Sequence, residues 1–259
     1  KVMEIEGKRS KLLVSEEAMI LAAGRGNRMR YFTKYIAKPL IKIENKSLLE
    51  LNLIKLSSTG IKKCIINTSY KHLSVKKFIK TYNFRKKYPK IIVSNETNRL
   101  ETGGGVKNVL QKFTREKVLV INGDSLIINS SCTCPIKNLY NYFSDYMDIL
   151  LLLVPKKNAI GYSGNGDFLR SSNCEVFNIK RKKILDKSGL VFTGWQIIKK
   201  DILNSVSKDI FSLNLAYNLA EKEKKLYGIV YDGTFLHIGN PKSYLLARNH
   251  LKKNNLKLS

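Results

Sequence analysis

The stretch of residues 18–43 constrains the fold of this chain more than any other. Its sequence is AMILAAGRGNRMRYFTKYIAKPLIKI, an apolar run followed by a glycine-rich turn and several cations. This pattern predicts a buried strand that ends in an anion-binding turn, because glycines allow a ligand close to the backbone and adopt dihedral angles that other residues avoid. Arg28, Arg30 and Lys38 add positive charge after the strand. The stretch therefore predicts a site for a polyphosphate.

The first half of the chain alternates strand-like and helix-like segments. Apolar runs predict strands at residues 18–23, 63–68, 90–94 and 117–122. Helical spacing and capping residues, Ser74 among them, predict helices at residues 47–58, 74–82 and 106–113. Such alternation predicts an α/β fold with a Rossmann-like, mostly parallel sheet and helices on both faces. Ligands bind beyond the carboxyl ends of such strands, where the glycine turn and Asp124 would meet.

The second half of the chain is less regular. Apolar runs predict strands in four places: residues 148–154, 190–198, 227–231 and 234–238. The last two flank Asp232-Gly233, which indicates a hairpin turn. A glycine-rich loop is predicted at residues 159–167, and helices at 211–223 and 241–251, the latter capped by Asn240. No repeat or linker divides the chain, so we expect one domain at residues 18–252, between an N-terminal extension (1–17) and a C-terminal tail (253–259).

The charge balance is strongly basic, with 47 Lys and Arg residues against 20 Asp and Glu residues, a net charge of +27. One interpretation is nucleic-acid binding. The other is drift in a genome rich in A and T, which enriches Lys, Asn and Ile together, as in KKCIIN and LKKNNLKLS. Because the lysines are scattered along the chain instead of gathered in one stripe, we favour drift and expect no specific nucleic-acid partner.

The cysteines and the apolar runs indicate the compartment. The four cysteines show no paired CxxC spacing, so a zinc site is not expected, and Cys132 and Cys134 are expected to be a reduced pair in a loop. The longest apolar run, residues 149–154, is too short to span a membrane. Residues 1–17 are charged throughout and do not resemble a signal peptide. We therefore expect a cytoplasmic protein without a membrane partner.

The segment LAAGRGNRMR…TKYIAKPL resembles the signature LAAGxGxRMxPLTxxxPKPLLxV of sugar-1-phosphate nucleotidyltransferases, also called NDP-sugar pyrophosphorylases. Five further motifs follow in the family's order: LETGGGV (100–106), VINGD (120–124), NGDF (165–168), VFTG (191–194) and FLHIGNP (235–241). The resemblance covers residues 18–250 and implies the nucleotide-diphospho-sugar transferase fold. The LETGGG and GDF motifs look most like the MurU branch, the N-acetylmuramate 1-phosphate uridylyltransferases of cell-wall recycling.

The resemblance implies a reaction of an NTP with a sugar 1-phosphate that gives an NDP-sugar and pyrophosphate. The sugar phosphate would attack the α-phosphorus in line, without a covalent enzyme intermediate. A mannose-1-phosphate guanylyltransferase is the alternative within this class. A nucleotide- or sugar-sensing protein without activity is an alternative from another class. A monomer is compatible with the sequence, which does not determine the oligomeric state.

The resemblance also assigns roles to individual residues. Arg28 and Lys38 would be catalytic, binding charge on the phosphates, and Asp124 would bind the metal ion. The nucleotide would contact Ala22, Ala23, Gly24, Gly26, Asn27, Gly103 and Gly104. The sugar phosphate would contact Asn165, Gly166, Asp167, Thr193 and Gly194. The glycines and strand ends among these residues also have a plain structural interpretation, as turns that bind nothing.

One position departs from the family's pattern. The family's second metal ligand is an Asp in a WxDVGT motif, and His237 occupies the matching position here. Mg²⁺ is the expected cofactor, but imidazole suits Mn²⁺, Zn²⁺ or Fe²⁺ better, so Mn²⁺ is an alternative. Three roles are compatible with His237: it binds the metal directly, it orients a metal-bound water or a phosphate, or it marks a weakened site. We favour the first two because Arg28, Lys38 and Asp124 are all present.

Overall fold

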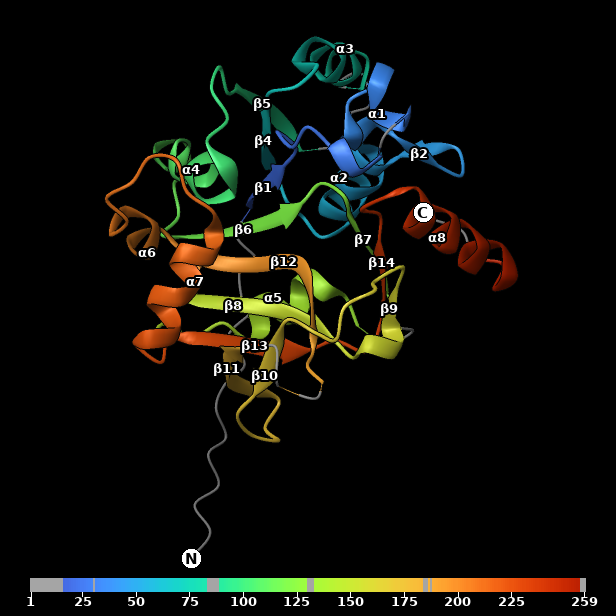
Figure 1. Cartoon of the computed structure of the whole chain (residues 1–259). Helices are drawn as coiled ribbons and strands as arrows, with labels where there is room; N and C mark the ends of the chain where they lie inside the picture. The colour runs from blue at the N-terminus through green and yellow to red at the C-terminus, as the bar shows by residue number, and fades with distance from the viewer. Residues whose placement is uncertain are drawn as a thin grey trace, which may run out of the picture.

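A nine-stranded sheet runs through the centre of the molecule (Figure 1). The computed structural model describes residues 16–29, 31–82, 89–129, 133–183, 186 and 188–256. The strand order is β10-β11-β13-β8-β12-β6-β1-β4-β5. The strands of the first half are β1 (Glu17–Leu21), β4 (Lys63–Thr68), β5 (Lys90–Asn95) and β6 (Lys117–Asn122). Those of the second half are β8 (Ile149–Val154), β10 (Phe168–Arg170), β11 (Val176–Arg181), β12 (Val191–Lys199) and β13 (Leu226–Val230).

The parallel part of the sheet surrounds β1. β1 pairs in parallel with β4 on one side and β6 on the other, and β4 pairs in parallel with β5. Ala18, Met19 and Ile20 of β1 are fully buried, as expected of a strand covered on both faces. Leu21 is in register with Asn67 of β4 and Asn122 of β6, so three carboxyl ends lie side by side.

The second half of the chain makes the sheet mixed. β12 runs antiparallel to both β6 and β8, and β11 runs antiparallel to β13 and β10, whereas β13 and β8 are parallel. The predicted α/β architecture is confirmed, and the predicted parallel order applies to β5-β4-β1-β6 and to β8-β13. The sequence did not indicate the antiparallel pairings, because a strand buried on both faces has the same apolar pattern in either direction.

Helices cover both faces of the central sheet, as predicted. Apolar side chains of α2 (Leu48–Ser58), α3 (His72–Tyr82) and α5 (Pro135–Tyr142) pack in one cluster with Ala18 and Ile20. Those of α4 (Glu101–Lys107), α6 (Lys200–Asn204) and α7 (Leu213–Lys222) pack in a second cluster with Met19. Successive side chains of a strand point to opposite faces, so one strand supplies both clusters.

A small sheet of three strands lies beside the central one. Its order is β7 (Ser125–Ile128), β14 (Thr234–His237) and β9 (Ala159–Ile160). It packs on α2 and on α8 (Pro241–Lys253) through a third apolar cluster that includes Leu48, Leu126, Leu236 and Ala247. The remaining elements are short: α1 (Tyr31–Tyr35), the hairpin of β2 (Lys42–Ile43) and β3 (Lys46–Ser47), and 3₁₀ turns at Asn27–Met29, Lys38–Leu40, Leu110–Lys112 and Lys156–Asn158.

The hairpin predicted around Asp232-Gly233 is wrong. β13 stays in the central sheet, whereas β14 crosses to the small sheet and pairs with β7 and β9. Tight hairpin turns of the Asp-Gly type need positive φ angles, and neither Asp232 nor Gly233 has one. Tyr231 fixes the crossing, because its ring is fully buried and its hydroxyl donates to the carbonyl of Thr133 at 2.8 Å.

Two helix predictions also need correction. The helix predicted at 106–113 begins and ends earlier in the structure: α4 spans Glu101–Lys107 and contains the three glycines that precede the predicted start. The backbone N–H groups of Gly103 and Gly104 both donate to the carbonyl of Phe211, which anchors the helix against the segment before α7. Ser74 does not cap α3, which begins two residues earlier; its hydroxyl donates to the carbonyl of Lys71.

Other predicted ends are confirmed. The helix predicted from residue 47 begins there, with Ser47 as its N-cap. Asn240 caps α8 as predicted, and the Asn240 side chain and the Ser243 hydroxyl bond reciprocally to each other's backbone N–H groups. Residues 1–15 of the predicted extension, 257–259 of the predicted tail, Arg30 and Cys132 lie outside the described residues. Within the described part, Cys64, Cys134 and Cys174 are free thiols, and no helix has the length and apolar character needed to cross a membrane.

The close packing of α4 predicts that Gly104→Ala destabilises the fold. A Cβ atom at Gly104 would lie 2.1 Å from the backbone oxygen of Asp209, so the backbone must move. We expect a loss of about 2–3 kcal/mol in the free energy of unfolding, measured by urea denaturation. Gly24→Ala is the matched control, since neither glycine has a positive φ and a Cβ at Gly24 meets no atom within 4 Å. Equal urea denaturation midpoints for the two variants would show that the close approach of Asp209 does not require glycine at position 104.

Candidate functional site

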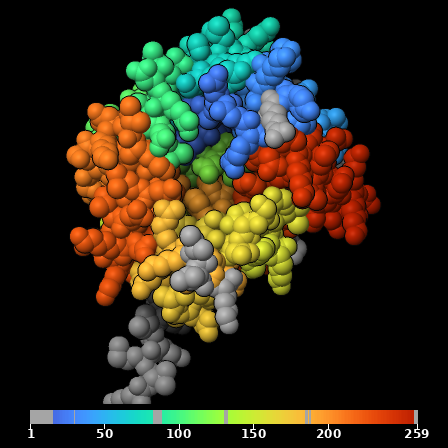
Figure 2. Space-filling view, viewed as in Figure 1, coloured from blue at the N-terminus to red at the C-terminus, as the bar shows by residue number. Residues whose placement is uncertain are grey.

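A cleft of about 350 Å³ opens at the carboxyl ends of β1, β4 and β6. Figure 2 shows the hollow near the middle of the molecule, between the blue and green first half of the chain and the yellow, orange and red second half. Eight residues predicted from the sequence line it: Ala22, Ala23, Gly24, Gly26, Asn27, Arg28, Lys38 and Asp124. The structure therefore brings the predicted phosphate turn, the lysine and the carboxylate into one cavity.

The turn after β1 is held in shape by its second glycine. Gly26 has a φ of +70°, and its carbonyl accepts hydrogen bonds from the Met29 N–H at 2.8 Å and the Thr33 hydroxyl at 3.0 Å. A Cβ at Gly26 would lie 2.9 Å from the Thr33 methyl carbon and 3.1 Å from Lys38 Cβ, so only glycine lets Lys38 approach the turn. Gly24 has open space around it, where a ligand can reach the backbone.

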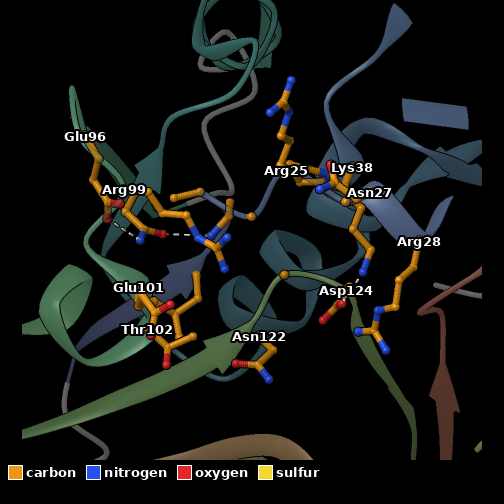
Figure 3. A pocket seen from close by; sticks show the side chains of 18 of the residues that line it. Arg25, Asn27, Arg28, Lys38, Glu96, Arg99, Glu101, Thr102, Asn122 and Asp124 are labelled. Atoms are coloured by element: carbon orange, nitrogen blue, oxygen red, sulfur yellow. Dashed lines mark hydrogen bonds and ion pairs between the residues drawn. The ribbon is translucent and has the colours of Figure 1, made fainter. Parts of the chain in front are cut away.

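Lys38 and Asp124 form an ion pair inside the cleft (Figure 3). Lys38 begins a 3₁₀ turn, and Asp124 follows β6, whose end is fixed by the Gly123 N–H donating to the Leu21 carbonyl at 2.9 Å. Burial would raise the pKa of Asp124, but the charge and hydrogen bond of Lys38 more than offset it, with a smaller contribution from His237, which is protonated at the low pH where Asp124 titrates. The pKa of Asp124 therefore lies below its usual value, and the carboxylate is ionised at neutral pH.

His237 does not line the cleft itself but lies next to it, on the side of Asp124. It ends β14 in register with Ser125 of β7, the residue after Asp124. Its Nε2 atom lies 2.5 Å from where a Cβ of Gly239 would be, so this cleft-lining glycine makes room for the imidazole. Burial lowers the pKa of His237, and Lys38 and Arg28 lower it further against the opposing effect of Asp124. The imidazole is therefore neutral at pH 7 and keeps a lone pair for a ligand.

The donors near Asp124 suit a divalent cation only in part. A carboxylate oxygen and a neutral imidazole nitrogen are both common ligands of such ions. In the described ranges, no group of three or more His, Cys, Asp and Glu side chains is placed to hold a metal ion. Among the described residues, Asp124 and His237 thus offer at most two side chains of these four types, and other oxygens, such as those of phosphate groups, would have to complete the coordination.

The far end of the cleft contains a buried polar network that the sequence did not reveal. The Ala22 N–H donates to Asn67 Oδ1 at 2.7 Å, and Asn67 Nδ2 donates to Glu96 Oε1 at 2.7 Å. The second oxygen of Glu96 accepts from the Leu100 N–H at 3.3 Å. Asn67 and Glu96 are 2% and 4% exposed, so the network fixes the backbone of Ala22 against the cleft. In the sequence, the polar residues at the ends of β4 and β5 could have indicated this network.

Gly103 and Gly104 do not line the cleft. Both are buried against the segment before α7, where a Cβ at Gly103 would lie 2.3 Å from the Phe211 ring. Their neighbours Glu101 and Thr102 line the cleft instead. Glu101 has a φ of +63°, an unusual angle for a residue other than glycine, at the start of α4. The glycines therefore position the lining residues through packing.

The five residues predicted to bind the sugar phosphate lie outside this cleft. Asn165 accepts a hydrogen bond from Lys156, and Asp167 accepts from the Tyr162 hydroxyl and the Phe192 N–H, all at 2.9 Å. The Tyr162 ring stands edge-on to His237 with centroids 6.2 Å apart, so this segment reaches the wall that holds the imidazole.

Thr193, Gly166 and Gly194, the remaining residues predicted to bind the sugar phosphate, have structural roles. Thr193 is fully buried, and its hydroxyl donates to the Leu152 carbonyl at 2.8 Å. Gly166 and Gly194 have φ angles of +97° and +81°. Cβ atoms there would lie 2.3 Å from the Gly189 carbonyl carbon and 2.6 Å from Asn122 Nδ2. These glycines are required by the backbone whether or not a sugar binds nearby.

Comparison with known proteins places the chain among nucleotide-handling enzymes. The sequence model of the family described as Nucleotidyl transferase matches residues 17–254. The chain is 28% identical over 235 residues to the N-acetylmuramate alpha-1-phosphate uridylyltransferase of Caulobacter vibrioides, a match that covers 90% of this chain and 96% of that relative. It is 32% identical over 243 residues to the D-glycero-alpha-D-manno-heptose 1-phosphate guanylyltransferase of Aneurinibacillus thermoaerophilus, covering 91% and 98%.

A solved structure gives the same fold. HddC from Yersinia pseudotuberculosis matches with a TM-score of 0.71 at 24% identity, covering 91% of this chain and 99% of that chain. HddC has also been solved in complex with GMP-PN. The nucleotide-diphospho-sugar transferase fold implied by the motifs is therefore confirmed.

The buried network predicts that Asn67→Leu is more harmful than Asn52→Leu. Both side chains are almost fully buried, at 2% and 1% exposure. Asn67 joins Ala22 to Glu96, whereas Asn52 makes one long bond of 3.4 Å to the Gly123 carbonyl and its Oδ1 has no partner among the described residues. We expect Asn67→Leu to lower the free energy of unfolding by about 2 kcal/mol more than the control, measured in urea. Equal losses of stability in the two variants would show that the hydrogen bonds of Asn67 to Ala22 and Glu96 do not stabilise the fold.

Proposed function

Because this chain belongs to the Nucleotidyl transferase family, we propose that it transfers a nucleotidyl group from an NTP to a sugar 1-phosphate and releases pyrophosphate. The family and the named relatives make it an enzyme of the nucleotidyltransferase class. The observation that supports the proposal most is the Lys38–Asp124 pair beside the glycine turn, in one cleft with Arg28. This arrangement offers cations and backbone N–H groups to one anion and a carboxylate to a metal ion.

In this reaction, different residues of the cleft would have different roles. Residues 24–28 would bind the triphosphate through backbone N–H groups and the Arg28 side chain. Lys38 would contact the α-phosphate, where a sugar-phosphate oxygen attacks and the bond to the leaving phosphate breaks. Its ammonium group stabilises the charge that develops there, and the rigid turn holds it in place. The wall around Asn67 and Thr102 would hold the nucleoside, with the fixed backbone of Ala22 close to it.

A divalent metal ion fits this proposal. The family is generally dependent on such an ion. Asp124 and His237 would hold it, and it would supply positive charge against the phosphates of the two substrates. Mg²⁺ suits the carboxylate and the phosphate oxygens, and the imidazole makes Mn²⁺ a competent substitute.

We favour N-acetylmuramate 1-phosphate and UTP as the substrates, in cell-wall recycling. The LETGGG and NGDF motifs and the relative from Caulobacter vibrioides support this choice. A guanylyltransferase of heptose or mannose 1-phosphate is the second candidate, favoured by the 32% identity to the Aneurinibacillus relative. Both reactions consume an NTP, and the proposal includes the cytoplasmic location expected from the sequence.

Pyrophosphate release tests the function directly. The protein is incubated with each NTP, Mg²⁺ or Mn²⁺, and a panel of sugar 1-phosphates, and we expect turnover with one preferred pair. Lys38→Met should lower kcat about 100- to 1000-fold, as when a donor to a developing charge is lost. Lys76→Ala, which removes an exposed lysine of α3, should leave kcat unchanged. No turnover with any pair, together with retained nucleotide binding, would favour a sensor over an enzyme.

The metal role of His237 predicts a change in metal dependence. His237→Ala should raise the Mn²⁺ concentration needed for half-maximal rate roughly tenfold or more, because one ligand is lost. His237→Asp is the matched variant, since it restores a ligand but replaces nitrogen with oxygen and should shift the preference towards Mg²⁺. An unchanged metal dependence in both variants would exclude His237 as a ligand.

A further inference from the structure

A second hollow of about 410 Å³ lies next to the cleft. It is lined by Arg25, Asn27, Thr33, Lys34 and Tyr70, and it shares Arg25 and Asn27 with the cleft. The two cavities therefore meet at the glycine turn. None of the roles assigned above uses the side chain of Arg25, Lys34 or Tyr70.

The second hollow gathers several positively charged side chains. Lys71 Nζ donates to the Lys34 carbonyl at 2.6 Å, which brings a third cation to the group of Arg25 and Lys34. Among the residues that the structure describes, no carboxylate forms an ion pair with any of these three. Cations brought together in this way repel one another, so the arrangement favours a multivalent anion as ligand.

Aromatic rings hold these cations in place. The Arg25 guanidinium lies over the Tyr70 ring at 5.5 Å from its centroid, and Lys71 Nζ lies over the same ring at 5.4 Å. The Tyr70 hydroxyl donates to the Thr33 carbonyl at 3.2 Å, which fixes the ring against α1. Figure 3 shows the Arg25 side chain pointing away from Asp124, on the other side of the turn from Arg28. A tethered guanidinium loses less conformational freedom when it binds a phosphate.

We infer that the second hollow binds inorganic pyrophosphate, the product that leaves the cleft. This inference rests on the proposed function. When the sugar-phosphate oxygen bonds to the α-phosphorus, the bond from that phosphorus to the bridging oxygen breaks, and its electron pair stays on the departing pyrophosphate. The leaving anion emerges at the glycine turn, where Arg25 and Asn27 border both cavities, and Lys34 receives it on the far side. Arg25 and Lys34 thus stabilise the product after transfer and draw it away from Lys38.

Calorimetric titration with pyrophosphate, in the absence of NTP, tests the second hollow. Lys34→Ala should weaken pyrophosphate binding about tenfold, because a charge-assisted contact is lost. Tyr70→Leu should weaken it about two- to fivefold, because the Arg25 guanidinium loses its ring. The matched control is Lys80→Ala, which removes one exposed positive charge from α3 and should leave the affinity unchanged.

Two outcomes would overturn the inference. Equal losses in Lys34→Ala and Lys80→Ala would reduce the effect to net charge. A KM for the NTP that rises in Lys34→Ala as much as the pyrophosphate Kd would place the substrate's terminal phosphate in the second hollow, and the hollow would then not be a product site. We expect the KM for the NTP to change less than about twofold. The titration needs no turnover, so it remains decisive even if no substrate pair reacts.

Discussion

The parallel pairing of β1 with both β4 and β6 is the constraint on which the site depends. Because the register aligns Leu21 with Asn67 and Asn122, three strands end at one level, and the loops that follow must share the space above them. The glycine turn, the Asn67 network and Asp124 are those loops and ends. The Lys38–Asp124 ion pair then joins segments 86 residues apart across the cleft, so the central strand positions charges that the sequence keeps far from one another.

The sequence predicted this half of the molecule well, for a physical reason. Strands buried on both faces are continuous apolar runs, and the chain places glycines and charges directly after them, so β1, β4 and β6 and the phosphate turn could be located. The second half was harder because its strands pair with distant partners. Asp232-Gly233 has the composition of a hairpin turn, but the burial of Tyr231 decides the path of the chain, and burial of that kind is a property of the whole fold.

The glycines show how far a motif can be interpreted. Gly26 and Gly104 both belong to sequence motifs of the site, but the first shapes the phosphate turn and the second lets α4 pack against Asp209. Composition cannot separate these two uses, since each needs the absence of a Cβ. The Asn67–Glu96 network escaped prediction because its three segments are remote in sequence. By contrast, the FLHIGNP motif predicted a metal-binding role for His237, and the structure sets this residue in register with Ser125, the residue after Asp124.

The crossing of the chain from β13 to β14 has a consequence for biosynthesis. Strand β14 brings His237 to the site only after more than 230 residues have been made. In a nascent chain, β1, β4 and β6 can already be paired, with the glycine turn, Lys38 and Asp124 in place, before β14 has been synthesised. Since chains fold from the N-terminus as they emerge, the half with the glycine turn precedes the segment that holds His237 in time. The segment that holds His237 can therefore pack beside Asp124 only after β14 has been synthesised.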